Sequence, residues 1–187
     1  MPFETVEGER GTSVSSSNLK SPIEQCMPRL QILHLNCTEI SELSFSAGVC
    51  PNLQHLDMRG CNHVVEVGTL PNTLQLLCMT GCDSLVEVGT FPNTLRTLEL
   101  YRLHNLRKIE GLCGLTKLQW LQIRWCKELE ELRGIETLIS LKELDASRCA
   151  KLKTIRGLGC LTKFQVLDFH MCCGLEELLD IKQIYGK

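Results

Sequence analysis

The sequence contains twelve cysteines and five histidines, the residue types that most often serve as metal ligands or as catalytic nucleophiles and bases. Cys78, His55 and Asp57 fall on neighbouring units of an internal repeat and would bring together a thiol, an imidazole and a carboxylate. A catalytic cysteine also needs an oxyanion donor and a pocket that excludes water, and the open sheet predicted below offers neither. With so many cysteines, some proximity of this kind is expected. We therefore predict no catalytic residue and no enzymatic activity.

Five other cysteines recur at one position of the repeat. A small side chain with a hydrogen-bond donor at such a bend can bind a backbone carbonyl of the neighbouring unit, which predicts a structural ladder. Zinc binding would favour closely paired ligands such as C-x-x-C, and disulfides would need an oxidising compartment, so both alternatives are disfavoured. We expect no metal and no cofactor. The predicted ladder consists of Thr38, Cys61, Cys82, Cys126, Cys149 and Cys172, and Leu103 takes the position in the remaining unit.

These residues must be positioned by a repeat that runs through most of the chain. The stretch VEVGTLPNTL at 65–74 returns as VEVGTFPNTL at 86–95. The wider pattern is L-x-x-L-x-L-x-x-C, in units 21 or 23 residues apart. Near-constant spacing of this kind indicates a stacked repeat architecture. The units start at Leu30, Leu53, Leu74, Leu95, Leu118, Leu141 and Phe164.

The alternation inside each unit predicts its local structure. Leu118, Leu121 and Ile123 can all be buried only if the L-x-L segment is a short strand with alternate side chains directed inward. One such unit cannot bury its own apolar face, so neighbouring units must stack. We predict an α/β solenoid of about seven repeats of 21–23 residues, with a curved parallel sheet on the concave side and irregular or short helical returns on the convex side. Residues 27–187 would form this domain, and residues 1–26 a polar, flexible segment.

The unit L-x-x-L-x-L-x-x-C-x-x-L-x-x-[LI]-x-G-[LI]-x-x-L resembles the leucine-rich repeats of plant nucleotide-binding disease-resistance proteins (NBS-LRR). The stretch LTKLQWLQIRWCKELEELRGIETLISLKELDASRCAKLKTIRGLGCLTKF, from residue 115, carries this resemblance most clearly. It implies a protein-recognition module that senses a ligand and restrains a nucleotide switch in plant defence signalling. The implied partner is an effector, a host protein or the receptor's own nucleotide-binding domain.

The sequence departs from those receptors because no G-x-x-x-x-G-K-[ST] phosphate loop is present. We therefore interpret the chain as the repeat region of such a receptor or a fragment of one. Two alternatives remain open: the substrate-recognition arm of a ubiquitin-ligase adaptor, and a free-standing scaffold.

The composition of the chain indicates which partners and which cellular location are expected. A formal net charge of −2 and the absence of long runs of Lys and Arg argue against nucleic-acid binding. No apolar run is long enough to span a bilayer, and the start of the chain has no apolar signal core, so we predict no membrane association. The expected location is intracellular, in the cytoplasm or the nucleus.

Outward side chains of the predicted strands form columns on the sheet, and the aromatic and basic residues gather in repeats four and five. Tyr, Trp and Arg dominate the binding energy of many protein interfaces. The alternative is an ordinary solvated face in which Arg124 stacks on a tryptophan and Asp145 balances nearby arginines. The predicted protein-binding residues are Tyr101, Arg102, Trp120, Arg124, Trp125 and Asp145.

Overall fold

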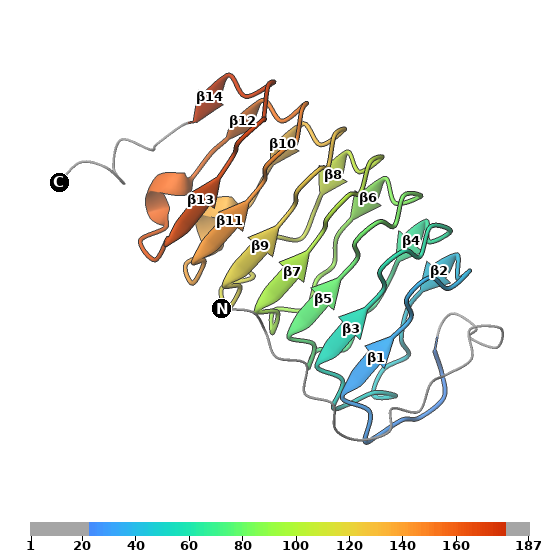
Figure 1. Ribbon diagram of the computed structural model, residues 1–187. Helices are drawn as coiled ribbons and strands as arrows, with labels where there is room; N and C mark the ends of the chain where they lie inside the picture. The colour runs from blue at the N-terminus through green and yellow to red at the C-terminus, as the bar shows by residue number, and fades with distance from the viewer. Residues whose placement is uncertain (1–22, 179–187) are drawn as a thin grey trace.

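The computed structural model describes residues 23–178 and shows a solenoid of stacked turns (Figure 1). Seven short parallel strands form the main sheet, and each is hydrogen-bonded to the equivalent strand of the next repeat. This arrangement confirms the predicted fold class. The strands, in spatial order, are β1 (Ile32–His34), β3 (His55–Asp57), β5 (Leu76–Cys78), β7 (Thr97–Glu99), β9 (Trp120–Gln122), β11 (Glu143–Asp145) and β13 (Val166–Asp168).

The return segments carry shorter, two-residue strands that pair in three separate outer sheets. Two 3-10 turns, η2 (Ile135–Thr137) and η3 (Leu158–Cys160), complete the returns of later repeats. None of the helices between residues 23 and 178 is long and apolar enough to span a bilayer. The outer pairs are β2 (Glu42–Leu43) with β4 (Glu66–Val67) and β6 (Glu87–Val88) with β8 (Lys108–Ile109), and the third sheet contains β10 (Glu131–Leu132), β12 (Thr154–Ile155) and β14 (Glu177–Leu178).

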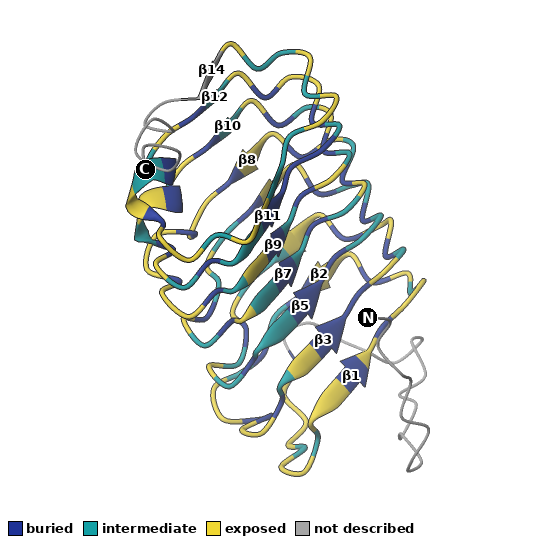
Figure 2. Cartoon of the chain, turned by 60° about the vertical axis from the view of Figure 1, so that its left-hand side comes forward, coloured by how far each residue is buried: buried dark blue, intermediate teal, exposed yellow. Residues whose placement is uncertain are grey.

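One continuous apolar interior runs through the stack, because the middle residue of each main strand points inward. Leu56, Leu77, Leu98, Leu121 and Leu144 are register partners in sequence and have no exposed surface. Figure 2 shows buried segments recurring from turn to turn across the described chain. Each turn thus supplies the wall that its neighbour lacks, which is how a solenoid buries a core.

The duplicated PNTL segments make the same contacts in two consecutive returns. Thr73 Oγ1 donates to the carbonyl of Leu53 at 2.8 Å, and Thr94 Oγ1 donates to the carbonyl of Leu74 at 2.7 Å. Pro71 and Pro92 each accept the backbone N–H three residues later and need no N–H of their own. The duplication therefore repeats one hydrogen-bonded step that joins each return to the preceding turn.

At the amino-terminal side, packing extends to Ile23, which is buried and forms a parallel bridge with Phe45. Most of the predicted polar segment 1–26, and residues 179–187 of the predicted repeat domain, lie outside the described residues. The division at residue 26 therefore stays a prediction.

Candidate functional site

The recurring cysteines lie where each main strand ends and the chain turns toward its return. Each thiol donates a hydrogen bond to a backbone carbonyl of the preceding turn. These carbonyls lie beyond the ends of the strands, so they accept no hydrogen bond from a paired strand. Thr38 is half-buried, and its Oγ1 lies 3.4 Å from Cys61 Sγ. The five thiol bonds are Cys61 to Leu35 at 2.9 Å, Cys82 to Met58 at 3.1 Å, Cys126 to Leu100 at 3.0 Å, Cys149 to Ile123 at 2.8 Å and Cys172 to Ala146 at 3.0 Å.

At three positions of the ladder, Cys82, Cys149 and Cys172, the surroundings raise the thiol pKa and favour the protonated form that donates, whereas the side-chain hydrogen bond with Cys82 lowers the pKa of Cys61. The adjacent thiol of Cys126, followed by burial, raises the pKa of Cys149 above its ordinary value. Burial raises the pKa of Cys172 to about 11. Every cysteine in the described part is free, and no group of three His, Cys, Asp or Glu residues there is arranged to hold a metal ion.

Cys78, His55 and Asp57 lie on adjacent main strands, but their chemistry differs from that of a catalytic trio. Asp57 and Cys78 are register partners, whereas His55 is paired with Leu76. Burial raises the pKa of Cys78 to about 11, and its Sγ lies 3.3 Å from Thr80 Oγ1. A thiol of this pKa carries almost no thiolate at neutral pH, so it lacks the activation that a cysteine nucleophile requires.

Aspartates at the ends of main strands are used to brace the following bend. Asp57 Oδ1 accepts the backbone N–H of Arg59 at 3.1 Å, Asp145 Oδ1 accepts that of Ser147 at 3.0 Å, and Asp168 Oδ1 accepts that of His170 at 2.9 Å. Asp145 is only 5% exposed, and its Oδ2 lies 2.6 Å from Arg124 Nε. The carboxylate of Asp145, a predicted contact residue, is thus occupied by the bend and by Arg124, and a contact of Asp145 with a partner stays a prediction.

The predicted aromatic and basic patch is divided between two places. Trp120 begins β9 and is 37% exposed, with the Lys142 ammonium 5.3 Å from its ring centroid. Trp125 lies in the bend after the same strand, next to Tyr101 and Arg102 of the preceding repeat. Trp120 therefore lies on the sheet and Trp125 in the bend that follows it, on different parts of the same repeat.

The bends after the main strands have left-handed backbone conformations. Glycine occupies this position in two repeats, as Gly60 and Gly81. In the other repeats the residues are Cys37, Arg102, Trp125, Arg148 and Met171, with φ between 56° and 64°. A non-glycine residue in this conformation costs about 1–2 kcal/mol. The conformation is held by a backbone ladder, since Arg102 N donates to Arg124 O at 2.9 Å and Trp125 N to Ser147 O at 3.0 Å.

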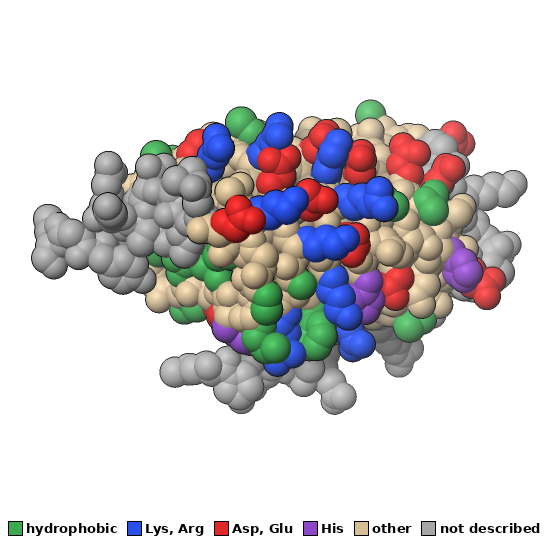
Figure 3. Space-filling view, turned by 90° about the horizontal axis from the view of Figure 1, so that it is seen from above, with side chains coloured by type: hydrophobic (Ala, Val, Ile, Leu, Met, Phe, Trp, Pro, Cys, Tyr) green, Lys and Arg blue, Asp and Glu red, His purple; other side chains and the backbone are tan. Residues whose placement is uncertain are grey.

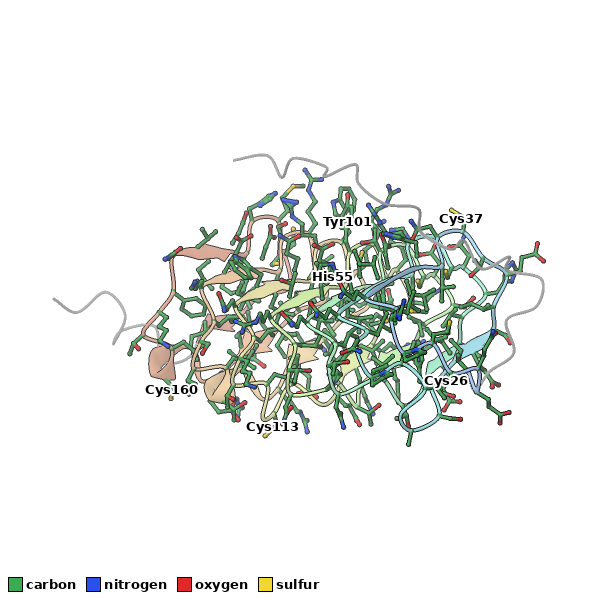
Figure 4. The ribbon with its side chains drawn as sticks, turned by 90° about the horizontal axis from the view of Figure 1, so that it is seen from below. Cys26, Cys37, His55, Tyr101, Cys113 and Cys160 are labelled. Carbon is green, nitrogen blue, oxygen red and sulfur yellow. The ribbon has the colours of Figure 1, made fainter. Side chains whose placement is uncertain are left out.

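Side chains of these bends form a cationic and aromatic surface, which we call the bend ridge. The guanidinium carbon of Arg148 lies 4.5 Å from the Trp125 ring centroid, and Lys127 Nζ lies 5.7 Å from it. The guanidinium carbon of Arg102 lies 6.0 Å from the Tyr101 ring centroid. Figure 4 shows Tyr101 on the same margin as Cys37, opposite Cys113 and Cys160 of the return side. The bend ridge consists of Tyr101, Arg102, Trp125, Lys127 and Arg148.

Arg148, Lys127 and Lys142 were not among the predicted site residues. Arg148 stands one position before Cys149, as Trp125 stands before Cys126 and Arg102 before Leu103. Reading the column that precedes the ladder would have identified Arg148. Lys127 and Lys142 belong to the surface only because the bend and the next strand bring them over a ring, and no sequence pattern indicates this.

A different charge arrangement covers the outer sheets. Lys151 Nζ lies 2.6 Å from Glu128 Oε2, and Lys153 Nζ lies 3.2 Å from Glu130 Oε2. Figure 3 shows basic and acidic side chains alternating over this side of the molecule. Charges of opposite sign in adjacent turns attract each other across the stack, so this side is largely neutralised by its own pairs.

Comparison with known proteins identifies the type of repeat. The family model described as leucine rich repeats (2 copies) matches residues 28–72. No curated protein matches the chain. Among solved structures, a leucine-rich repeat protein from Bacteroides ovatus shares 14% sequence identity, with a TM-score of 0.26 over 79% of this chain and 63% of that chain. The chain thus spans less than two thirds of that protein's length. Residues 28–72 are thus similar to leucine-rich repeats, and the equivalent strand, bend and return continue along the described solenoid.

Proposed function

We propose that this chain is a non-catalytic protein-recognition module whose partner contacts the main sheet and the bend ridge. Leucine-rich repeats generally mediate contacts between proteins. The observation that carries the proposal is the bend ridge, where half-buried rings and partly or fully exposed cations from three consecutive repeats are held on a hydrogen-bonded backbone. Rigid aromatic and arginine side chains combine large contact area with strong hydrogen-bond donors. Trp120, at the start of β9, offers a second aromatic contact on the same sheet.

We propose further that the repeats belong to a plant intracellular disease-resistance receptor, as its ligand-sensing and autoregulatory region. Support for this assignment is the resemblance of the cysteine-bearing repeat unit to the repeats of that family. The partner would be an effector, a host protein or the receptor's own nucleotide-binding domain, met in the cytoplasm or the nucleus. Family analogy can suggest a role of this kind, but the contact residues must be tested directly.

Affinity capture from plant tissue tests the recognition surface. The baits are the wild-type chain, Trp120→Ala and Trp125→Gly, and the matched control is Ile139→Ala, which alters an exposed apolar residue of a return segment. We expect a partner that is retained by wild type and Ile139→Ala and lost with at least one tryptophan variant. Retention of every captured protein by both tryptophan variants would remove the proposed surface.

The identity of the captured protein tests the finer assignment. A nucleotide-binding domain or an immune effector supports the receptor role. A subunit of a ubiquitin ligase would instead support the adaptor alternative.

A further inference from the structure

The bend ridge carries positive charge that the protein does not neutralise itself. Within residues 23–178, no carboxylate lies within 4.0 Å of the charged nitrogens of Arg102, Lys127 or Arg148, although other cations of the chain do have such partners. The three cations lie over the rings of Tyr101 and Trp125 instead. A ring face attracts a cation without cancelling its charge, so each cation can still bind an external anion.

Four carboxylates in the adjacent turns already have partners. Asp145 is bonded to Arg124 and to the backbone of Ser147, and Asp168 Oδ1 lies 2.8 Å from His170 Nδ1. Asp83 Oδ1 lies 3.1 Å from His104 Nδ1, and Glu128 lies 2.6 Å from Lys151. Glu99 is the last residue of β7, before the bend, and its charge contributes to raising the pKa of Arg59. The bend ridge is therefore a local excess of positive charge on a chain whose formal net charge is −2.

The fold itself does not require these side chains. Gly60 and Gly81 occupy the equivalent bend in earlier repeats and make the same backbone contact to the next turn. Glycine adopts a left-handed conformation without the steric penalty that other residues incur. Glycine, cysteine and methionine occupy the equivalent bend in the remaining repeats (Gly60, Gly81, Cys37 and Met171), so the bend conformation does not require the arginine and tryptophan side chains.

We propose that the bend ridge binds an acidic, extended segment of a partner protein, in which alternate carboxylates contact Arg102 and Arg148 on either side of Trp125. The proposal rests on the protein-recognition function above and specifies the chemical class of the partner. Adjacent strands are about 4.8 Å apart, so the two arginines, two repeats apart, are separated by about 10 Å along the stack. Alternate residues of an extended segment point to the same side and lie about 7 Å apart, so two carboxylates separated by one residue are within reach of the two flexible arginines.

A nucleic acid fits this surface less well. Proteins that bind DNA mainly through phosphates commonly use about 6–10 cationic contacts, and the bend ridge offers three on a chain of net negative charge. A short acidic peptide needs only two or three.

Tryptophan fluorescence of the full chain tests the proposal. The chain has two tryptophans, so a Trp120→Phe background leaves Trp125 as the sole reporter. The probe is the peptide acetyl-Glu-Val-Glu-Val-Glu-amide, and the comparison peptide has glutamine at each glutamate. The ridge variant is Arg102→Gly with Arg148→Gly. The matched control, Arg96→Gln with Lys117→Gln, removes two exposed cations from the return side of the main strands.

We expect the glutamate peptide to shift Trp125 emission and the glutamine peptide to bind at least about tenfold more weakly, with affinity falling as salt is raised. The ridge variant should bind at least about tenfold more weakly while its melting temperature is not lowered, and the control should match wild type. A ridge variant that also unfolds is replaced by Arg102→Gln with Arg148→Gln, for which the same loss is expected.

Several results would overturn the proposal. These are equal affinity for the two peptides, undiminished binding by both ridge variants, and tighter binding of a fifteen-residue oligothymidylate than of the glutamate peptide. Self-association in sedimentation that ridge variants abolish, without peptide binding, would assign the ridge to a second copy of this chain. If the peptide fails to bind but tissue capture still depends on Trp120 or Trp125, the acidic partner class is wrong and the recognition function stands.

Discussion

Cys126 Sγ donates to the carbonyl oxygen of Leu100 at 3.0 Å, joining residues that are 26 positions apart in the chain. Both residues are fully buried. The thiol fits between consecutive turns because cysteine is small, and its weak donor satisfies a carbonyl that faces no strand partner. The same contact occurs in four other turns, so these thiols form a hydrogen-bonded ladder that joins consecutive turns, which we call the seam.

Replacing Cys126 therefore tests the seam. Cys126→Ala removes one buried hydrogen bond and one sulfur atom, and should lower the free energy of unfolding by about 1–2 kcal/mol. Cys126→Arg places an unpaired charge in the stack and should cost at least about 3 kcal/mol. Urea denaturation followed by circular dichroism measures both changes. A Cys126→Arg variant with an unchanged midpoint would mean that this position is not buried in solution.

Thiol reactivity should follow burial and pKa. At pH 7.5 we expect iodoacetamide to modify the exposed Cys113 and Cys160, while Cys78 reacts only when the protein is denatured, because burial raises its pKa to about 11. Peptide mass spectrometry at timed intervals measures the rates. Native labelling of Cys78 at the rate of Cys113 would contradict the buried, protonated thiol and would reopen the question of a reactive cysteine.

Because of Asp57, the free energy of unfolding should decrease at acidic pH. Burial alone would raise the pKa of Asp57, but the side-chain and backbone hydrogen bonds from Arg59, with its charge, lower the pKa below the ordinary value of 3.8. The unfolded chain then binds the proton more readily than the folded chain. The stabilisation is complete above about pH 5 and is lost as pH falls through the folded pKa.

The measurement is the free energy of unfolding from pH 6 to pH 2.5 for wild type and Asp57→Asn. The variant should be less stable at pH 6, and its curve should be flatter in the acidic range. Glu42→Gln, at an exposed position of an outer strand, serves as the control and should follow wild type. Parallel curves for wild type and Asp57→Asn would exclude Asp57 as a source of acid sensitivity.

Charge alternation across the outer sheets should contribute modestly to stacking. Glu130→Lys places a lysine beside Lys153, whose Nζ lies 3.2 Å from Glu130 Oε2 in the native protein. Exposed pairs contribute little, so we expect a fall in melting temperature of about 1–3 °C that shrinks at high salt. Exchanging the charges, with Glu130→Lys and Lys153→Glu together, should restore most of the loss. No recovery in the double variant would show that these ions do not interact measurably.

The interior residues of the main strands could be predicted because two periods coincide in this sequence. The alternation of Leu118, Leu121 and Ile123 selects the inward face of a strand, and the 21- or 23-residue step places equivalent residues beside one another. The cysteine column follows from the same step, since its members must meet consecutive turns at the same bend.

The candidate site was predicted less completely. Sequence columns indicate which residues share a repeat position, but they do not give the length of the strands or the direction of side chains at bends. Trp120 begins β9, whereas Trp125 lies three residues beyond its end, in the bend. Asp145 was expected to contact a partner, and its carboxylate is buried against Arg124.

The sequence by itself determined the repeat, its parallel stacking and its leucine interior, because burial of apolar side chains at a fixed period has only one consistent solution. Tertiary structure alone decided which polar side chains remain available. That outcome depends on bend conformations such as the left-handed backbone of Arg102, Trp125 and Arg148, which contacts between turns impose on residues with no local preference for it.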